Sequence, residues 1–205
     1  MKKTIFCNIP MKEKLTAHIY RSEERSLPAS ERAVVYPITA FLEKTLRPED
    51  EVCAVLLVKK DKDGNYQRNA AVFMQEFLAA NEHIGARIEF KTVESEFEEE
   101  QSVHEDLLGR IVDVTEEGAH LLADITYGPK DLPIVLFVAL GFAERHLGCE
   151  VDHLLYGQVE FRDGEPTNPR LCDMVPLYCL SAVTSAVCAD GPQKARQMLK
   201  TLLSV

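Results

Sequence analysis

Hydrophobic positions along the chain form short continuous runs that alternate with stretches of helical spacing. Residues 51–58 form a nearly continuous apolar run, which is typical of a strand buried on both faces of a parallel sheet. Residues 3–9 and 120–126 are also short and mainly apolar. Residues 87–93 alternate between polar and apolar side chains, and residues 151–156 form another short apolar run. The pattern therefore predicts a strand at each of these segments.

Between these runs, apolar residues recur three and four positions apart, which predicts amphipathic helices. The expected helices cover residues 33–45, 69–81, 102–116, 131 to about 147, 174–188 and 192–203. Asp131 is expected to cap the fourth of these helices, and Pro133 to lie in its first turn. Residues 158–170 are polar and contain Asp163-Gly164, so they form either a loop or a short hairpin.

Strands that alternate with helices imply right-handed βαβ units. The sequence therefore predicts a three-layer α/β fold of Rossmann type, with a mostly parallel sheet and helices on both faces. No internal repeat or convincing linker interrupts the pattern, so we expect residues 1–205 to form a single domain. The acidic run at residues 94–100 is expected to be a solvated surface loop, and the sequence assigns it no role.

Charge and hydropathy argue against two classes of partner. The net charge is −10, whereas a protein that grips long nucleic acid through its phosphates is usually basic. A small anionic ligand stays compatible, because local lysines and helix N-termini hold phosphates on acidic proteins. No apolar stretch reaches the roughly 18 residues that a membrane span needs. The longest one, residues 132–142, is broken by Pro133 and Gly141, so we expect neither long nucleic acid nor a membrane as a partner.

Cysteine usage and the N-terminus indicate the cellular compartment. The apolar N-terminal stretch ends after a few residues, so no secretory signal is expected. The six cysteines form no CxxC pair and show no metal-ligand spacing with histidine. This usage favours free thiols in the reducing cytoplasm and argues against structural zinc. We therefore expect a cytoplasmic protein with no metal and no cofactor.

Ligands of an open parallel sheet bind at the carboxyl ends of its strands, where the connecting loops meet. Three loops are candidates here: Asn8-Ile9-Pro10-Met11-Lys12, Thr126-Tyr127-Gly128-Pro129-Lys130 and Tyr156-Gly157-Gln158. In the second loop, Gly128 permits a tight turn, Thr126 offers a hydroxyl, and Lys130 places a charge beside a helix N-terminus. These features make a phosphate cradle. The alternative is that glycine and proline serve the turn alone.

Other chemistry has less support in the sequence. There is no GxGxxG, GxxxxGK[ST] or GxSxG motif, which argues against dinucleotide dehydrogenases, P-loop NTPases and the common hydrolases. Cys7 lies within an apolar strand and is expected to be a packed thiol. Asp124 either organises the second loop by accepting backbone hydrogen bonds or faces solvent at the strand end. Lys12 and Lys14, each taken alone, are expected to be exposed surface lysines.

Residues 124–133 (DITYGPKDLP) resemble the D-[IL]-T-[HY]-G-x-[RK]-x-[LI]-P segment of the CRISPR-associated Rossmann-fold (CARF) proteins. The apolar helix that follows, and the next strand ending at Tyr156-Gly157, are similar to the family as well. Residues 8–11 resemble the family's first ligand loop more weakly. Many members add a ribonuclease in which four to six residues separate an arginine from a following histidine. This sequence has no such pair, so it resembles a stand-alone member.

The resemblance implies a homodimer whose loops surround a two-fold axis. There it would bind a cyclic oligoadenylate, the tetra- or hexa-adenylate, made by a type III CRISPR complex. It also implies that Thr126, Gly128 and Lys130 contact phosphate or ribose. The other residues implied in ligand binding shape the rim or lie beside the adenines: Asn8, Ile9, Pro10, Met11, Tyr127, Pro129, Tyr156 and Gly157.

Three functions remain open at this point. In the first, the protein is a metal-independent ring nuclease, in which a ribose 2′-OH attacks the adjacent phosphate and leaves a 2′,3′-cyclic phosphate. Its expected catalytic residues are Lys130, Thr126 and Lys12, and no general base is evident. In the second, the protein is a non-catalytic sensor or sponge that binds the messenger and regulates a partner. In the third, it is an unrelated Rossmann enzyme that acts on a small molecule.

Overall fold

The computed structural model describes residues 1–22, 27–28 and 31–204. Within these residues the strands are β1 (Lys2–Asn8), β2 (Glu51–Lys59), β3 (Arg87–Ser95), β4 (His120–Asp124), β5 (Glu150–Arg162) and β6 (Glu165–Asp173). The helices are α1 (Pro37–Thr45), α2 (Asn65–Asn81), α3 (Gln101–Val114), α4 (Asp131–His146), α5 (Val175–Ser185) and α6 (Pro192–Leu203).

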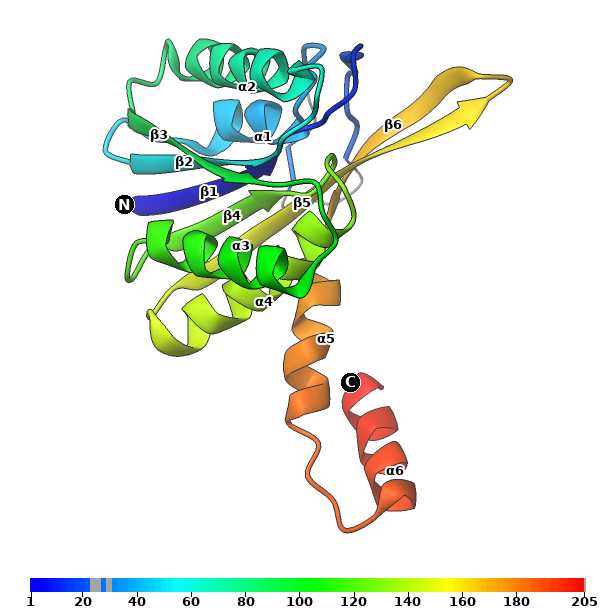
Figure 1. Cartoon of the computed structure of the whole chain (residues 1–205). Helices are drawn as coiled ribbons and strands as arrows, with labels where there is room; N and C mark the ends of the chain where they lie inside the picture. The colour runs from blue at the N-terminus through cyan, green and yellow to red at the C-terminus, as the bar shows by residue number, and fades with distance from the viewer. Residues whose placement is uncertain (23–26, 29–30, 205) are drawn as a thin grey trace. The chain divides into compact units, whose positions relative to one another are not determined.

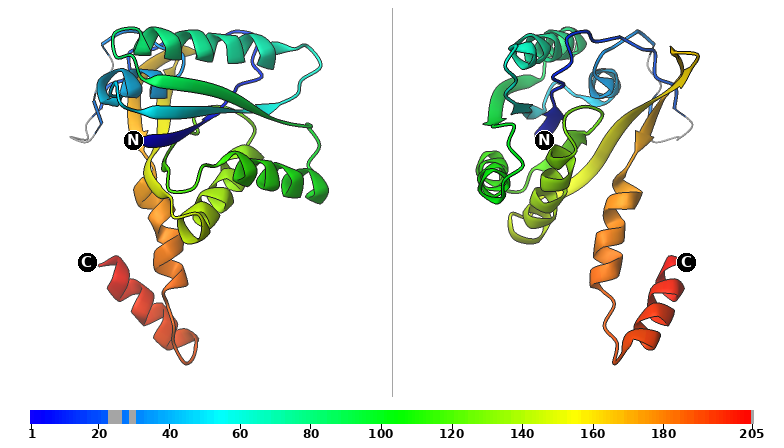
Figure 2. Two further views of the ribbon diagram at one scale, coloured as in Figure 1. Left: turned by 90° about the vertical axis from the view of Figure 1, so that its left-hand side faces the viewer. Right: turned by 45° about the vertical axis from the view of Figure 1, so that its right-hand side comes forward.

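The strands form one sheet in the order β3-β2-β1-β4-β5-β6 (Figure 1). Every neighbouring pair is parallel except β5 and β6, which are antiparallel. Helices α1 and α2 cover one face of the sheet, and α3 and α4 cover the other (Figure 2). The predicted three-layer α/β fold, with a mostly parallel sheet and helices on both faces, is confirmed.

Two-sided burial explains the apolar strands. From Val52 to Lys59, every residue of β2 is buried, and β1 is buried from Thr4 onward. On one face, α2 adds Phe73 and Phe77, both fully buried and packed edge to face at 5.8 Å between ring centroids. Each such side chain stabilises the fold by about 1.5–3 kcal/mol through removal of apolar surface from water. The core therefore holds the carboxyl ends of β1 and β2 rigidly in place.

The chain changes direction across the sheet between β1 and β4. After β1 the chain crosses to β2 on one side, whereas after β4 it crosses to β5 on the other. The loops that leave β1 and β4 therefore diverge, and they leave a crevice between them at the carboxyl edge of the sheet. This is the edge at which the sequence places the ligand loops.

The third predicted ligand loop is wrong. Gly157 lies inside β5, where it pairs with Leu171 of β6, and the strand continues to Arg162. The hairpin closes at Asp163 and Gly164, whose φ angles of 53° and 85° suit the two-residue turn that favours such residues. Of the two alternatives for residues 158–170, the hairpin is therefore correct, and Tyr156 and Gly157 reach the crevice from a strand.

Helices α1 and α2 each start four residues away from the prediction, and the cap of α4 also differs. Helix α2 begins at Asn65 and not at residue 69. Helix α1 begins at Pro37 and not at residue 33, because Pro37 suits a first helical turn and Val34 instead pairs with His18 as an isolated bridge. Helix α4 begins at Asp131, so Lys130 and not Asp131 occupies the capping position. The Asp131 carboxylate instead forms an ion pair with Lys59.

The chain divides into two compact units, Met1–Asp173 and Met174–Val205. The first contains the whole sheet and helices α1 to α4, and the second contains α5 and α6. That residues 1–205 act as a single domain stays a prediction. In the part of the chain that is described, no helix combines the length and the apolar character that crossing a membrane requires.

The packing around Gly157 gives a test of the hairpin's position. A Cβ at residue 157 would collide with Pro37 Cγ and lie 2.8 Å from Tyr20 Cε1, where neither ring can retreat freely. We expect Gly157→Ala to lower the free energy of unfolding by about 1–3 kcal/mol, measured by urea denaturation.

Gly109→Ala is the matched control. Gly109 lies within α3, and a Cβ there meets nothing within 4 Å. This change should raise stability by up to about 1 kcal/mol, because alanine favours a helix more than glycine does. Equal stability of the two variants would show that β5 does not press against Pro37 and Tyr20.

Candidate functional site

The carboxylate of Asp124 organises the loop that leaves β4. Asp124 is buried, with 1% of its surface exposed. Its Oδ1 accepts a hydrogen bond from the Thr126 backbone N–H at 2.9 Å, and its Oδ2 accepts one from the Ile38 N–H at 3.2 Å. Burial raises the pKa of Asp124, although these hydrogen bonds act in the opposite direction. The loop-organising role is therefore confirmed, and the carboxylate joins the loop to the start of α1.

Two further hydrogen bonds fix the same loop. The Thr126 Oγ1 accepts the backbone N–H of Gly157 at 2.8 Å, which ties the loop to β5. The Tyr127 hydroxyl donates to the Val35 carbonyl at 3.0 Å, and burial raises the pKa of this phenol, so it stays protonated. The Tyr127 ring also packs edge to face on Tyr36 at 5.6 Å. Thr126 and Tyr127 therefore hold the loop that leaves β4 in position.

Gly128 and Asn8 meet where the β4 loop crosses the end of β1. Gly128 has φ 88°, and a Cβ there would lie 2.9 Å from Leu132 Cδ1 and 3.3 Å from Asn8 Cβ, so the turn requires glycine. Asn8 is 1% exposed, and neither its Oδ1 nor its Nδ2 has a hydrogen-bond partner among the described residues. Such an amide costs about 1–3 kcal/mol for each unpaired group, so the Asn8 side chain is a candidate contact for a ligand.

Helix α2 holds the loop that leaves β1. The Asn69 Nδ2 donates to the carbonyls of Pro10 at 2.7 Å and Lys12 at 2.9 Å. Ile9 and Pro10 are buried and contribute shape, whereas Met11 is half-buried and Lys12 is exposed. Met11 and Lys12 are therefore the more accessible part of this loop, and Pro10 contributes to the wall of the larger pocket described below.

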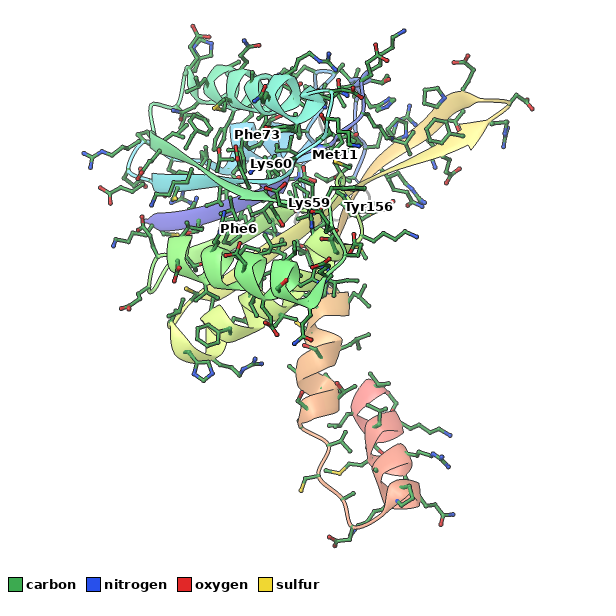
Figure 3. All side chains as sticks on the ribbon, viewed as in Figure 1. Phe6, Met11, Lys59, Lys60, Phe73 and Tyr156 are labelled. Carbon is green, nitrogen blue, oxygen red and sulfur yellow. The ribbon has the colours of Figure 1, made fainter. Side chains whose placement is uncertain are left out.

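Two adjoining pockets lie at this edge. One has a volume of about 530 Å³ and is lined by Pro10, Met11, Lys12, Phe97, Thr126, Tyr127, Gly128 and Pro129. The other, of about 380 Å³, includes Lys12, Lys14, His18, Tyr20, Thr126, Tyr127, Tyr156 and Gly157 in its lining. Both volumes lie in the range of small-molecule sites. Lys12, Thr126 and Tyr127 line both pockets. Figure 3 labels Met11, which lines the larger pocket, and Tyr156, which lines the smaller one.

His18 is a candidate that the sequence did not reveal. It lines the smaller pocket, and its backbone pairs with Val34 through hydrogen bonds of 2.9 and 3.0 Å. Burial lowers the pKa of His18 below its ordinary value of 6.5, so the neutral imidazole predominates near pH 7 and can accept a proton. Residues 10–25 have no periodic pattern that would place His18 here. Only the bridge to Val34 brings it to the pocket.

Lys130 lies apart from the two pockets. It is exposed and lines a third groove, of about 730 Å³, between α3 and α4, together with Glu99, Asp131 and Ile134 among others. The residues of the predicted phosphate cradle therefore lie in two different places. Thr126 and Gly128 line the crevice between the β1 and β4 loops, whereas Lys130 belongs to the other side of the α4 start.

Comparison with known proteins adds no relative. No protein-family model matches this chain, and no curated protein matches it either. The CARF resemblance of residues 124–133 thus stays a prediction.

The role of Asp124 can be measured through stability. Asp124→Ala leaves the buried N–H group of Ile38 and the partly buried N–H group of Thr126 without their acceptor, so we expect a loss of about 2–4 kcal/mol in the free energy of unfolding. Urea denaturation measures this loss. Asp152→Ala, which removes a carboxylate that accepts from His120 at a half-exposed position, is the control and should cost less than about 1 kcal/mol.

The stability difference between wild type and Asp124→Ala should depend on pH. The folded-state pKa of Asp124 lies above the ordinary value of 3.8, so the folded chain binds more protons than the unfolded chain between these values. The stability that Asp124 contributes is therefore complete below 3.8 and declines as the pH rises through its folded pKa. The difference between wild type and Asp124→Ala should be larger at about pH 4 than at about pH 7. A stability difference that grows toward neutral pH would contradict the conclusion that burial raises the pKa of Asp124.

Proposed function

We propose that this protein binds a cyclic oligoadenylate at a cleft between two copies of the chain and cleaves it as a metal-independent ring nuclease. The observation that carries the proposal is the pair of adjoining pockets lined by the β1 and β4 loops, with Lys12, Thr126 and Tyr127 common to both. Residues 124–133, which resemble the CARF motif, supply the β4 side of these pockets.

The pockets offer the groups that an adenylate needs. Lys12 and Lys14 supply positive charge for phosphate on a chain whose net charge is −10. Phe97 is 55% exposed and Tyr156 is 37% exposed, so each can present a ring face to an adenine. The unpaired amide of Asn8 lies beneath Gly128 and can accept or donate a hydrogen bond once the loop shifts slightly.

A two-fold assembly suits a cyclic ligand with an even number of identical units. A tetra- or hexa-adenylate ring can present the same atoms twice, and two copies of the chain would present the same loops twice. In this proposal Lys12 takes the main phosphate contact, because Lys130 lines neither pocket of a single chain.

The proposed cleavage needs one proton acceptor and one source of positive charge. His18 takes the proton from a ribose 2′-OH, whose oxygen forms a bond to the adjacent phosphorus. The bond from phosphorus to the 5′ oxygen breaks, that oxygen takes up a proton, and a 2′,3′-cyclic phosphate remains. Lys12 stabilises the charge that develops on the phosphate oxygens.

A non-catalytic sensor is the second candidate, and a specific observation favours it. The Thr126 Oγ1 already accepts from Gly157, and the Tyr127 hydroxyl already donates to Val35. Residues engaged in this way bind a ligand more readily than they take part in a reaction. Binding without cleavage would then follow if His18 does not reach a ribose hydroxyl.

The two candidates differ in one assay. Purified protein is incubated with cyclic tetra-adenylate and with cyclic hexa-adenylate in the presence of EDTA. Linear products ending in a 2′,3′-cyclic phosphate support the ring nuclease, and we expect His18→Ala to lower their rate at least about tenfold while the affinity stays unchanged. Intact ligand that co-elutes with the protein supports the sensor. No binding to either ring would contradict both candidates.

The phosphate contact has its own test. We expect Lys12→Ala to weaken binding by about tenfold or more, the effect of losing one charge-assisted hydrogen bond, measured by isothermal titration calorimetry. Lys130→Ala should have a smaller effect, and Lys62→Ala, an exposed lysine that lines neither pocket, should have none. A larger loss with Lys130→Ala than with Lys12→Ala would contradict this assignment. It would show that Lys130, as the CARF motif implies, makes the main phosphate contact.

A further inference from the structure

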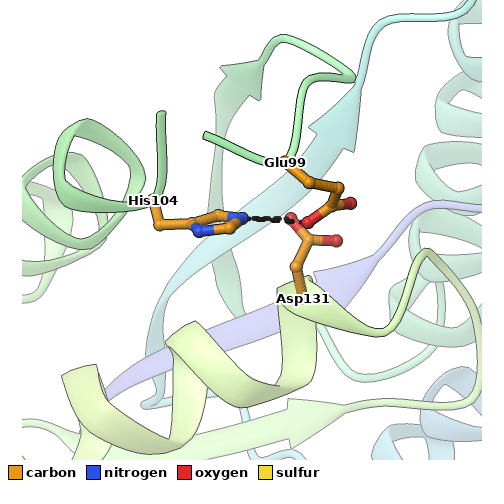
Figure 4. Close-up of side chains that lie close together, drawn as sticks. All are labelled: Glu99, His104 and Asp131. Atoms are coloured by element: carbon orange, nitrogen blue, oxygen red, sulfur yellow. Dashed lines mark hydrogen bonds and ion pairs between the residues drawn. The ribbon is translucent and has the colours of Figure 1, made fainter. Parts of the chain in front are cut away.

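Three side chains that carry metal-binding atoms meet beside the α3–α4 groove (Figure 4). Glu99 comes from the acidic run after β3, His104 from the first turns of α3, and Asp131 from the start of α4. The His104 Nε2 lies 3.0 Å from Glu99 Oε2 and 3.8 Å from Asp131 Oδ2. One ligand atom from each residue lies within 4.8 Å of the other two. The three atoms are therefore close enough to share one ion.

Asp131 supplies an independent indication. Its side chain is 8% exposed, and its Oδ2 forms an ion pair with Lys59 Nζ at 2.7 Å. Its Oδ1 is buried and has neither a hydrogen bond nor an ion pair with any described residue. A buried carboxylate oxygen without a partner is costly, so the Asp131 carboxylate has the capacity to accept a cation in addition to Lys59.

We propose that Glu99, His104 and Asp131 bind one divalent transition-metal ion of the zinc type. An imidazole nitrogen with two carboxylate oxygens is a donor set that such an ion accepts, and three protein ligands leave a fourth position open. The groove of about 730 Å³ lies beside this position and is lined in part by Leu108 and Ile134, so water or a small anion can complete the coordination.

The local charge favours a cation. Lys59 is fully buried, and its Nζ also donates to the Glu96 carbonyl at 2.8 Å. With histidine counted as neutral, the two carboxylates and Lys59 sum to −1, and further glutamates of the acidic run lie nearby in sequence. Lys59 holds the Asp131 carboxylate in place through Oδ2, which makes Lys59 a positioning residue.

The site gives the acidic run a function. An ion held in this way would clamp Glu99, from residues 94–100, to the first residue of α4. It lies outside the two pockets of the proposed ligand site, so it does not depend on that function.

The test uses the full chain with Cys179 and Cys188 changed to serine, because exposed thiols bind zinc by themselves. Protein freed of metal by a chelator is titrated with Zn²⁺ by calorimetry and thermal denaturation. We expect one ion per chain and a rise in Tm on the order of 5 °C at about a hundredfold excess over Kd. Co²⁺ in place of Zn²⁺ should give the visible bands of a site with nitrogen and oxygen donors.

Two variants locate the ion. His104→Ala and Glu99→Gln should each weaken Zn²⁺ binding at least tenfold and abolish most of the rise in Tm. Asp131→Asn is not used alone, because it would leave Lys59 buried without its charge partner. His120→Ala is the matched control, since it removes the imidazole from a second group formed with Glu150 and Asp152.

Each outcome decides the proposal. Loss with His104→Ala and Glu99→Gln, and retention with His120→Ala, supports the site. Absence of one-to-one Zn²⁺ binding by the parent protein overturns it. Loss with His120→Ala and retention with His104→Ala also overturns it, because the ion would then belong to the second group.

Discussion

The position of the candidate ligand site depends on one buried carboxylate. Asp124 ends β4 at the point where the chain changes direction across the sheet, and it accepts hydrogen bonds from the backbones of Ile38 and Thr126. Thr126 in turn accepts from Gly157, so α1, the β4 loop and β5 are joined through two side chains. Burial raises the pKa of Asp124, and the hydrogen bonds that Ile38 and Thr126 donate to its carboxylate offset part of the cost of burying that charge.

A second buried charge separates the two sides of the α4 start. Lys59, at the end of β2, pairs with Asp131, at the start of α4, and both are almost fully buried. Removal of either partner would leave an uncompensated charge in the core, which is strongly destabilising. This pair therefore holds the first residue of α4 against the end of β2. On one side of this point, residues 126–129 line the crevice, whereas Lys130 and Asp131 line the α3–α4 groove.

Residues whose environment is set locally were predictable. The apolar run from Val52 to Val58 correctly predicted a strand buried on both faces. Cys7 is buried in the core, as expected from its apolar strand. Gly128 adopts the left-handed φ that a tight turn needs. Predictions about ends of elements were less accurate, because proline, tertiary hydrogen bonds and ion pairs decide them. Pro37 set the start of α1, and the pairing of β5 with β6 carried Gly157 into a strand.

The sequence by itself determined the three-layer fold, the edge of the sheet that carries the loops, and the segment that lines the crevice. Hydrophobic periodicity reports which face of each element is buried, and alternation of strands and helices leaves few arrangements. Only the tertiary structure placed His18 in the crevice and joined Glu99, His104 and Asp131 beside Lys59. These residues come from polar or unrelated segments, and their meeting depends on strand order and loop paths that no local pattern encodes.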